Sequence, residues 1–262
     1  MISDEQPLPR AGGPLPAGAP RKARWLLRRP DPAAEARLFC FPYSGCGATM
    51  YQRWPRWIGR VEVCPVQPPA RQNRITEPHY GSYEELAAAF IDYLRPYLDK
   101  PFGFFGHCGG ALPGVEVTYQ LDAAGLPPPR RLFVSSQVAP HDGPYGELLD
   151  LSTEQLGDLL RQIITNLGGE PAGAVIEMGL ELLVQDIEAN KRYLVPQVRP
   201  LPCGVTAIAW REDSMIPIDL MGGWRALTPD CRSVVLDGGH FEFIDAPTAL
   251  LGEFEHDLAP TR

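Results

Sequence analysis

The 262-residue sequence lacks long hydrophobic runs and lacks an excess of basic residues. No stretch approaches the roughly 18 consecutive apolar residues that a membrane-spanning helix needs. Asp and Glu outnumber Lys and Arg by 32 to 24, which gives a net charge of −8, whereas nucleic-acid-binding surfaces are basic. We therefore expect neither a membrane nor a nucleic acid as a partner.

The first residues lack the basic start and apolar core of a secretory signal, so we expect a cytoplasmic protein. Residues 1–20 are Pro/Gly-rich and contain too little apolar surface to offset the entropy of ordering, which predicts a disordered tail. The basic segment 21–29 predicts an edge strand with solvated arginines, and a docking patch for an acidic partner is the alternative.

The cysteines lack the spacing of a metal site or a redox pair, because there is no C-x-x-C and no histidine at ligand spacing. We expect no bound metal. In a reducing compartment they are free thiols, and most should be small buried residues. The six are Cys40, Cys46, Cys64, Cys108, Cys203 and Cys231.

What the sequence does contain is an alternation of short apolar runs and amphipathic helices, which is typical of a parallel sheet with crossover helices. The alternation predicts a single α/β domain over residues 21–262. The predicted strands are 38–41, 61–66, 102–105, 132–135, 205–210 and 233–236. A helix is expected to begin at Ser82 and to stop at Pro96, and another begins near Pro247.

The strand rhythm breaks at about residues 143–200, where two helices are expected, at 152–167 and 174–194. Helices inserted at this point predict a lid over a pocket, with packing on a sheet face as the alternative. We also expect a narrow, mostly apolar tunnel between the first of these helices and the nucleophile.

The sharpest motif is Gly106-His107-Cys108-Gly109-Gly110, which follows an apolar strand and precedes a helix. A nucleophile in such a strained turn needs glycine two positions away on each side, because a side chain there would collide with the backbone. The helix N-terminus favours the thiolate of Cys108. The pattern predicts Cys108 as a nucleophile, and a Gly-rich turn with a buried cysteine is the alternative.

A nucleophilic cysteine needs a base, and α/β-hydrolases supply it in the chain order nucleophile, acid, histidine. His240 follows the last strand and is the predicted base. The other histidines, which lack this setting or adjoin the nucleophile, are His79, His107, His141 and His256.

Asp213 follows the strand at 205–210 and is the predicted acid that orients the base. Its rivals are Glu212, Asp219 and Asp237. The backbone N–H groups of Gly109 and Ser44 are predicted to bind the oxyanion, since one follows the nucleophile and the other follows the first strand.

These motifs resemble the stand-alone type II thioesterases of nonribosomal peptide and polyketide synthases, from about Trp25 to the C-terminus. The segments that carry the resemblance are 38–45 (LFCFPYSG), 66–71 (VQPPAR), 77–78 (EP), 106–112 (GHCGGAL), 151–155 (LSTEQ), 167–169 (LGG) and 238–241 (GGHF). The resemblance implies an α/β-hydrolase fold with a mostly parallel central sheet, crossover helices and an inserted helical lid. It also implies a monomer whose partners are acyl or peptidyl carrier proteins.

The same resemblance implies a hydrolase that releases acyl or aminoacyl groups from carrier phosphopantetheine, with no cofactor of its own. The sequence departs from the family at Cys108, where serine is usual, at Gly109, where methionine is usual, at Pro113 and at Ala70. The exchange of an acyl group between a thioester and a thiol is nearly thermoneutral, so Cys108 leaves a second interpretation open. In that interpretation the enzyme is a transferase that moves the acyl group from one carrier to another thiol or amine.

Overall fold

The computed structural model describes residues 25–166, 170 and 173–259, and the predicted tail at 1–20 lies outside them. Within the described residues one sheet has the strand order β2-β3-β1-β4-β5-β6-β7, parallel except for β2, which pairs antiparallel with β3. The strands are β1 (Ala36–Phe41), β2 (Trp57–Ile58), β3 (Val61–Pro65), β4 (Phe102–His107), β5 (Arg131–Ser135), β6 (Gly204–Trp210) and β7 (Cys231–Leu236). The predicted parallel sheet is observed, with the two-residue β2 added.

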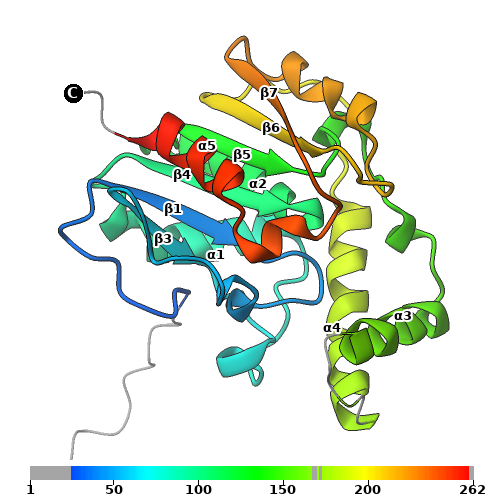
Figure 1. Cartoon of the computed structure of the whole chain (residues 1–262). Coiled ribbons are helices and arrows are strands. Elements are labelled where there is room, and N and C mark those ends of the chain that lie inside the picture. Colours follow the sequence, from blue (N-terminus) through cyan, green and yellow to red (C-terminus); the bar gives the residue numbers. More distant parts are fainter. Residues whose placement is uncertain (1–24, 167–169, 171–172, 260–262) are drawn as a thin grey trace, which may run out of the picture.

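Helices cover both faces of the sheet, because successive side chains of a strand point to opposite sides. Figure 1 shows α1 (Tyr83–Leu94) and α2 (Ala111–Ala123) behind the sheet and α5 (Thr248–Leu258) in front of it. Phe90 of α1 packs against Phe41, with ring centroids 5.5 Å apart. On the other face Phe254 of α5 packs against Phe133 at 4.9 Å. Ser82 caps α1 as predicted, since its hydroxyl accepts the N–H of Glu85.

Two helices are inserted between β5 and β6, namely α3 (Thr153–Asn166) and α4 (Gly173–Arg192). Ser152 and Gln155 form a capping box at the start of α3, where a helix was predicted to begin, and each side chain accepts the other's backbone N–H. Figure 1 shows α4 beside the end of the sheet where the strands terminate, with α3 lying across it. Ala189 of α4 and Tyr193, which directly follows the helix, pack on α1 and α2, and the Tyr193 and Tyr83 ring centroids lie 5.3 Å apart. The helical insertion therefore stands over the carboxyl end of the sheet.

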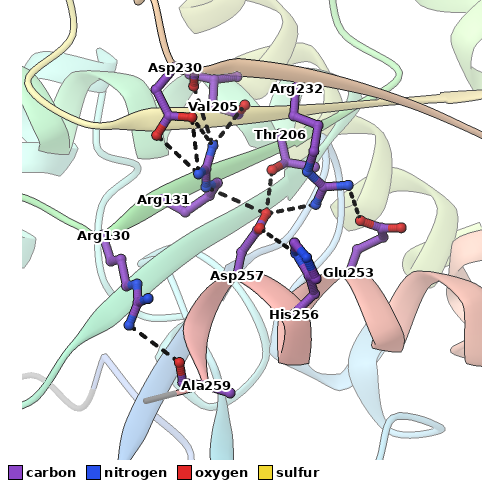
Figure 2. Close-up of polar contacts among 10 residues, drawn as sticks. All are labelled: Arg130, Arg131, Val205, Thr206, Asp230, Arg232, Glu253, His256, Asp257 and Ala259. Carbon is purple, nitrogen blue, oxygen red and sulfur yellow. Dashed lines mark hydrogen bonds and ion pairs between the residues drawn. The ribbon is translucent and has the colours of Figure 1, made fainter. Parts of the chain in front are cut away.

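The opposite end of the sheet is held by a buried carboxylate, that of Asp257 in α5 (Figure 2). It accepts hydrogen bonds from Thr206 of β6 at 2.6 Å and from Arg232 of β7 at 2.8 Å, and Arg131 of β5 lies at 3.5 Å. Burial alone would raise the pKa of Asp257, but these hydrogen bonds outweigh it and lower the pKa. The cluster anchors α5 to β5, β6 and β7 at the amino-terminal ends of these strands, which is the end of the sheet opposite the helical insertion.

The edge strand predicted at 21–29 is not formed in its described part, where the only pairing is an antiparallel bridge between Leu26 and Val66. Trp25 and Leu26 are nevertheless buried, and the Arg74 guanidinium lies 4.4 Å from the Trp25 ring. Side-chain packing thus holds a segment for which we expected a backbone ladder. Across the described ranges, no helix is long and apolar enough to cross a membrane.

Candidate active site

Cys108 stands in a sharp turn between β4 and α2, as the motif predicts. Its φ angle is +50°, a left-handed conformation that costs energy for any residue with a Cβ. A Cβ on Gly106 would lie 2.1 Å from the carbonyl oxygen of Gly110, and a Cβ on Gly110 would lie 2.7 Å from that of Pro42. Only glycine fits at both positions, so the chain can present Cys108 at the end of the sheet.

This tight approach gives a direct test of the turn. Gly106→Ala is expected to lower the free energy of unfolding by more than about 3 kcal/mol, because the clash is with backbone that cannot rotate away. Gly252→Ala is the matched control, since a Cβ at that exposed position in α5 meets nothing within 4 Å. The control should gain about 0.5–1 kcal/mol from helix propensity, as measured by chemical denaturation. Equal stability of the two variants would contradict the geometry.

His240 and Asp213 meet at the same end of the sheet, after β7 and β6. The Nδ1 of His240 donates to Oδ2 of Asp213 at 2.8 Å, which leaves Nε2 for the nucleophile. Ser136, which sequence reasoning missed, donates its hydroxyl to the same oxygen at 2.6 Å. The other oxygen of Asp213 accepts the backbone N–H groups of Met215 and Ile216. Both carboxylate oxygens of Asp213 therefore have hydrogen-bond partners, and these fix the carboxylate that orients His240.

The charges of this array favour a protonated histidine. Burial opposes protonation of His240, but its hydrogen bonds to Asp213 and Cys108, with their charges, outweigh burial and raise its pKa to about 9. Burial likewise acts to raise the pKa of Asp213, yet the hydrogen bonds from His240 and Ser136 hold it well below its usual range. A protonated imidazole beside a cysteine, held by a carboxylate, is the arrangement that thiolate nucleophiles use.

The His240 titration can be followed directly by NMR. We expect a midpoint near 9 in the wild type, and a lower midpoint in both Cys108→Ala and Asp213→Asn, because each variant removes a group that stabilises the imidazolium. An unchanged midpoint in Cys108→Ala would show that the thiol does not interact with the ring.

The rivals for the acid and the base lie elsewhere. Glu212 and Asp219 are exposed, and Asp237 is exposed and pairs with Arg211. His107 turns its Nδ1 to Ser135 at 2.9 Å and stacks on Phe243, so it supports the His240 ring from the side, with centroids 4.5 Å apart. The remaining histidines pair with acids outside the array, His79 with Asp186, His141 with Asp142 and His256 with Asp257.

Cys108 and His240 open onto a narrow cavity of about 20 Å³. Ser44, which follows β1, lines it, and a Cβ on Gly109 would lie 3.0 Å from the Ser44 hydroxyl oxygen. The two predicted oxyanion residues are thus neighbours beside the nucleophile. The rest of the wall is Tyr145, Gly146, Glu147, Leu148, Leu149, Ile187, Asn190, Met215 and Ile216. The prediction that the helix at 152–167 forms the wall is wrong for its described residues, because the described lining comes from α4 and from residues 145–149.

A buried ion-pair network that the sequence did not predict joins α4 to Arg71 and to the loop that follows β1. Asp186 accepts from Arg71 at 2.9 and 3.0 Å, from Tyr80 at 2.7 Å and from the backbone N–H of Gly45 at 2.7 Å, and His79 lies at 2.7 Å. Arg71 and Asp186 are each only 3% exposed. Because Gly45 directly follows Ser44, this network fixes the loop that carries the predicted oxyanion donor.

Metal chemistry has no donor set here: no group of three or more His, Cys, Asp or Glu side chains in the described part of the chain could hold a metal ion. All six cysteines are free thiols. The site is a cysteine–histidine–carboxylate array in a covered pocket.

The family model for the thioesterase domain matches residues 36–258. The chain belongs to the thioesterase family. Linear gramicidin dehydrogenase LgrE of Brevibacillus parabrevis is 33% identical to this thioesterase over 249 residues, which cover 90% of this chain and 93% of that protein. The predicted α/β-hydrolase fold and the predicted enzyme class, a thioester hydrolase, are confirmed by these comparisons together with the sheet topology.

Solved structures of thioesterases share the fold of this one. The RedJ thioesterase from the prodiginine biosynthetic pathway in Streptomyces coelicolor is 33% identical with a TM-score of 0.73, and the match covers 93% of this chain and 96% of that one. The type II thioesterase BorB from the borrelidin biosynthetic cluster is 28% identical with a TM-score of 0.74, covering 89% and 94%.

Proposed function

We propose that this thioesterase hydrolyses acyl or aminoacyl thioesters carried on the phosphopantetheine of carrier proteins, through an acyl-Cys108 intermediate. The observation that carries the proposal is that Cys108 and His240 line one small covered pocket, with Asp213 hydrogen-bonded to His240. The relatives from the prodiginine and borrelidin pathways support a role in secondary metabolite biosynthesis. A reducing cytoplasm would keep the thiol available.

The first half-reaction is acylation of the enzyme. The Cys108 thiolate attacks the thioester carbonyl carbon, and the tetrahedral oxyanion is bound by the N–H groups of Ser44 and Gly109. As the C–S bond to pantetheine breaks, the His240 imidazolium gives its proton to the leaving thiolate. Asp213 holds the ring in the tautomer that this transfer needs. The products are acyl-Cys108 and the free carrier thiol.

The second half-reaction is deacylation by water. Neutral His240 removes a proton from water as the oxygen attacks the acyl carbon, and the Cys108 thiolate leaves. The acyl group departs as the free acid and the imidazolium–thiolate pair is restored. Every proton in this scheme moves through His240, so the reaction requires no cofactor.

Transfer to a second thiol or amine is the alternative, and the cysteine itself is the observation that favours it. An acyl-thioester on Cys108 can pass to another thiol without an energetic penalty, whereas the oxyester formed by serine is more stable than the thioester product. The fold and the array serve both outcomes equally.

The fate of the acyl group separates the two functions. The enzyme is mixed with an acylated carrier, with and without a second, empty carrier, and the free acid and both carriers are quantified. Hydrolysis predicts that the acid is the product in both mixtures. Loading of the second carrier at the expense of the acid would establish the transferase, and an unchanged first carrier in both mixtures would overturn both proposals.

A further inference from the structure

The wall of the catalytic pocket contains one buried polar atom without a partner, Oδ1 of Asn190 in α4. The Asn190 side chain is 5% exposed and lines the pocket with Cys108 and His240. Among the residues that the structure describes, no donor reaches Oδ1. A buried amide oxygen left unpaired costs free energy, so its presence beside a nucleophile indicates a donor that arrives with the substrate.

The orientation of this amide is fixed by its other end. The Tyr83 hydroxyl donates to the carbonyl oxygen of Gly109 at 3.4 Å, so it can only accept from Asn190. Burial raises the pKa of the Tyr83 phenol, and the hydrogen bond with the Asn190 side chain acts in the opposite direction, as a donated N–H does. The NH₂ group therefore faces Tyr83, and Oδ1 is the atom left for a ligand.

Because Gly109 has no side chain, the Asn190 amide of α4 can lie close to the backbone at position 109. A Cβ on Gly109 would lie 3.0 Å from Nδ2 of Asn190 and 3.0 Å from the hydroxyl oxygen of Ser44. Both contacts are tighter than an ordinary van der Waals approach, so a side chain at 109 would require Asn190 and Ser44 to shift by a few tenths of an ångström. The Asn190 amide thus lies directly beside the residue proposed to bind the oxyanion.

We infer that Asn190 is a specificity-determining residue, whose Oδ1 accepts a hydrogen bond from an N–H on the α-carbon of the acyl group. The inference rests on the proposed function and narrows its substrate class to aminoacyl or peptidyl thioesters. The carbonyl oxygen of a bound thioester faces Ser44 and Gly109, and its leaving sulfur faces His240, which protonates it. The inference places the acyl α-carbon on the side of Asn190, which lines the same pocket as Cys108 and His240.

Alanyl- and propionyl-pantetheine test this inference, because they differ only by the α-amino group. We expect the wild type to favour the alanyl thioester in kcat/KM. Asn190→Leu, which has similar volume and no polar atom, should reduce the alanyl-to-propionyl ratio by about 10- to 100-fold. Asn190→Asp keeps an acceptor oxygen and should keep the preference. Ile187→Val, an apolar change in the same wall, should alter both substrates by the same factor.

Alanyl and propionyl thioesters of ethanethiol, which lacks the pantetheine amide, locate the donor. The inference predicts the same loss of alanyl preference with this leaving group. An equal loss of both pantetheine substrates, absent with ethanethiol esters, would assign the contact to the pantetheine amide and overturn it. If a thermal unfolding experiment showed that Asn190→Leu is not folded, the wild type alone would still test the inference. Equal turnover of the alanyl and propionyl thioesters by the wild type would overturn it. Turnover of neither acyl group by the wild type, when both are also presented on a carrier protein, would instead overturn the proposed function.

Discussion

Cys108→Ala is expected to lower kcat/KM for carrier-bound thioesters by about 10⁴-fold, because the variant loses the nucleophile and retains only the oxyanion donors and the binding pocket. The Cys108 side chain is partly exposed, lines the pocket with His240 and is held in a turn with a φ angle of +50°. Release of the carrier thiol, measured with a chromogenic thiol reagent, reports the loss. Retained turnover above about 10% would assign the chemistry to another residue.

The variant Cys108→Ser separates the role of the thiol in hydrolysis from its role in transfer to a second carrier. A hydroxyl in the same position can still be acylated and hydrolysed, but return of the acyl group from an oxyester to a thiol is uphill. We therefore expect this variant to retain part of the hydrolysis and to lose any transfer to a second carrier. Cys203→Ala is the matched control, since this free thiol precedes β6 at the other end of the sheet, and it should leave both activities unchanged.

Asp186→Asn is expected to lower the free energy of unfolding by about 3–5 kcal/mol, because the Arg71 guanidinium would remain buried without a counter-charge. The melting temperature should fall by roughly 10 °C. Glu188→Gln is the matched control, because it removes the same charge from an exposed pair with Lys191 on the same helix. The control should change stability by less than about 1 kcal/mol. Equal effects would show that the network is not what anchors α4.

The same variant has a defined pH dependence. Burial acts to raise the pKa of Asp186, but Arg71 and the hydrogen bonds from His79 and Gly45 outweigh it and lower the pKa to about 2. A group whose pKa is depressed by folding stabilises the protein above its unfolded pKa of about 4 and loses that contribution as pH falls toward 2. The stability difference between wild type and Asp186→Asn should thus be constant above about pH 5 and shrink below about pH 4.

Much of the fold and of the candidate site could be predicted because the deciding signals are local. Strand ends coincide with Gly, Pro or charged residues, and the caps at Ser82 and Ser152 mark where helices begin. The elbow around Cys108 requires glycines at fixed spacing. In a parallel sheet the carboxyl ends of the strands share one edge, so residues that follow different strands, such as Asp213 and His240, meet there.

The remainder could not be predicted, because it depends on pairs that are far apart in the sequence. Asp186 meets residues 115 and 141 positions away, and no local pattern marks it as more than a helical surface acid. Asn190 likewise becomes part of the pocket only because α4 turns that face toward α1 and α2. Ser136 had a weak signal, since it is a hydroxyl residue directly after a strand terminus. The lid was predicted as helical, but which helix lines the cavity depended on packing.

The most direct test of the central claim is the intact mass of the protein, acid-quenched milliseconds after mixing with aminoacyl-loaded carrier protein. A mass increase equal to one aminoacyl group, mapped to Cys108 and absent from Cys108→Ala, is the predicted result. Turnover of the carrier thioester by wild type with no adduct on Cys108 at any quench time, or with an adduct on another residue, would contradict it.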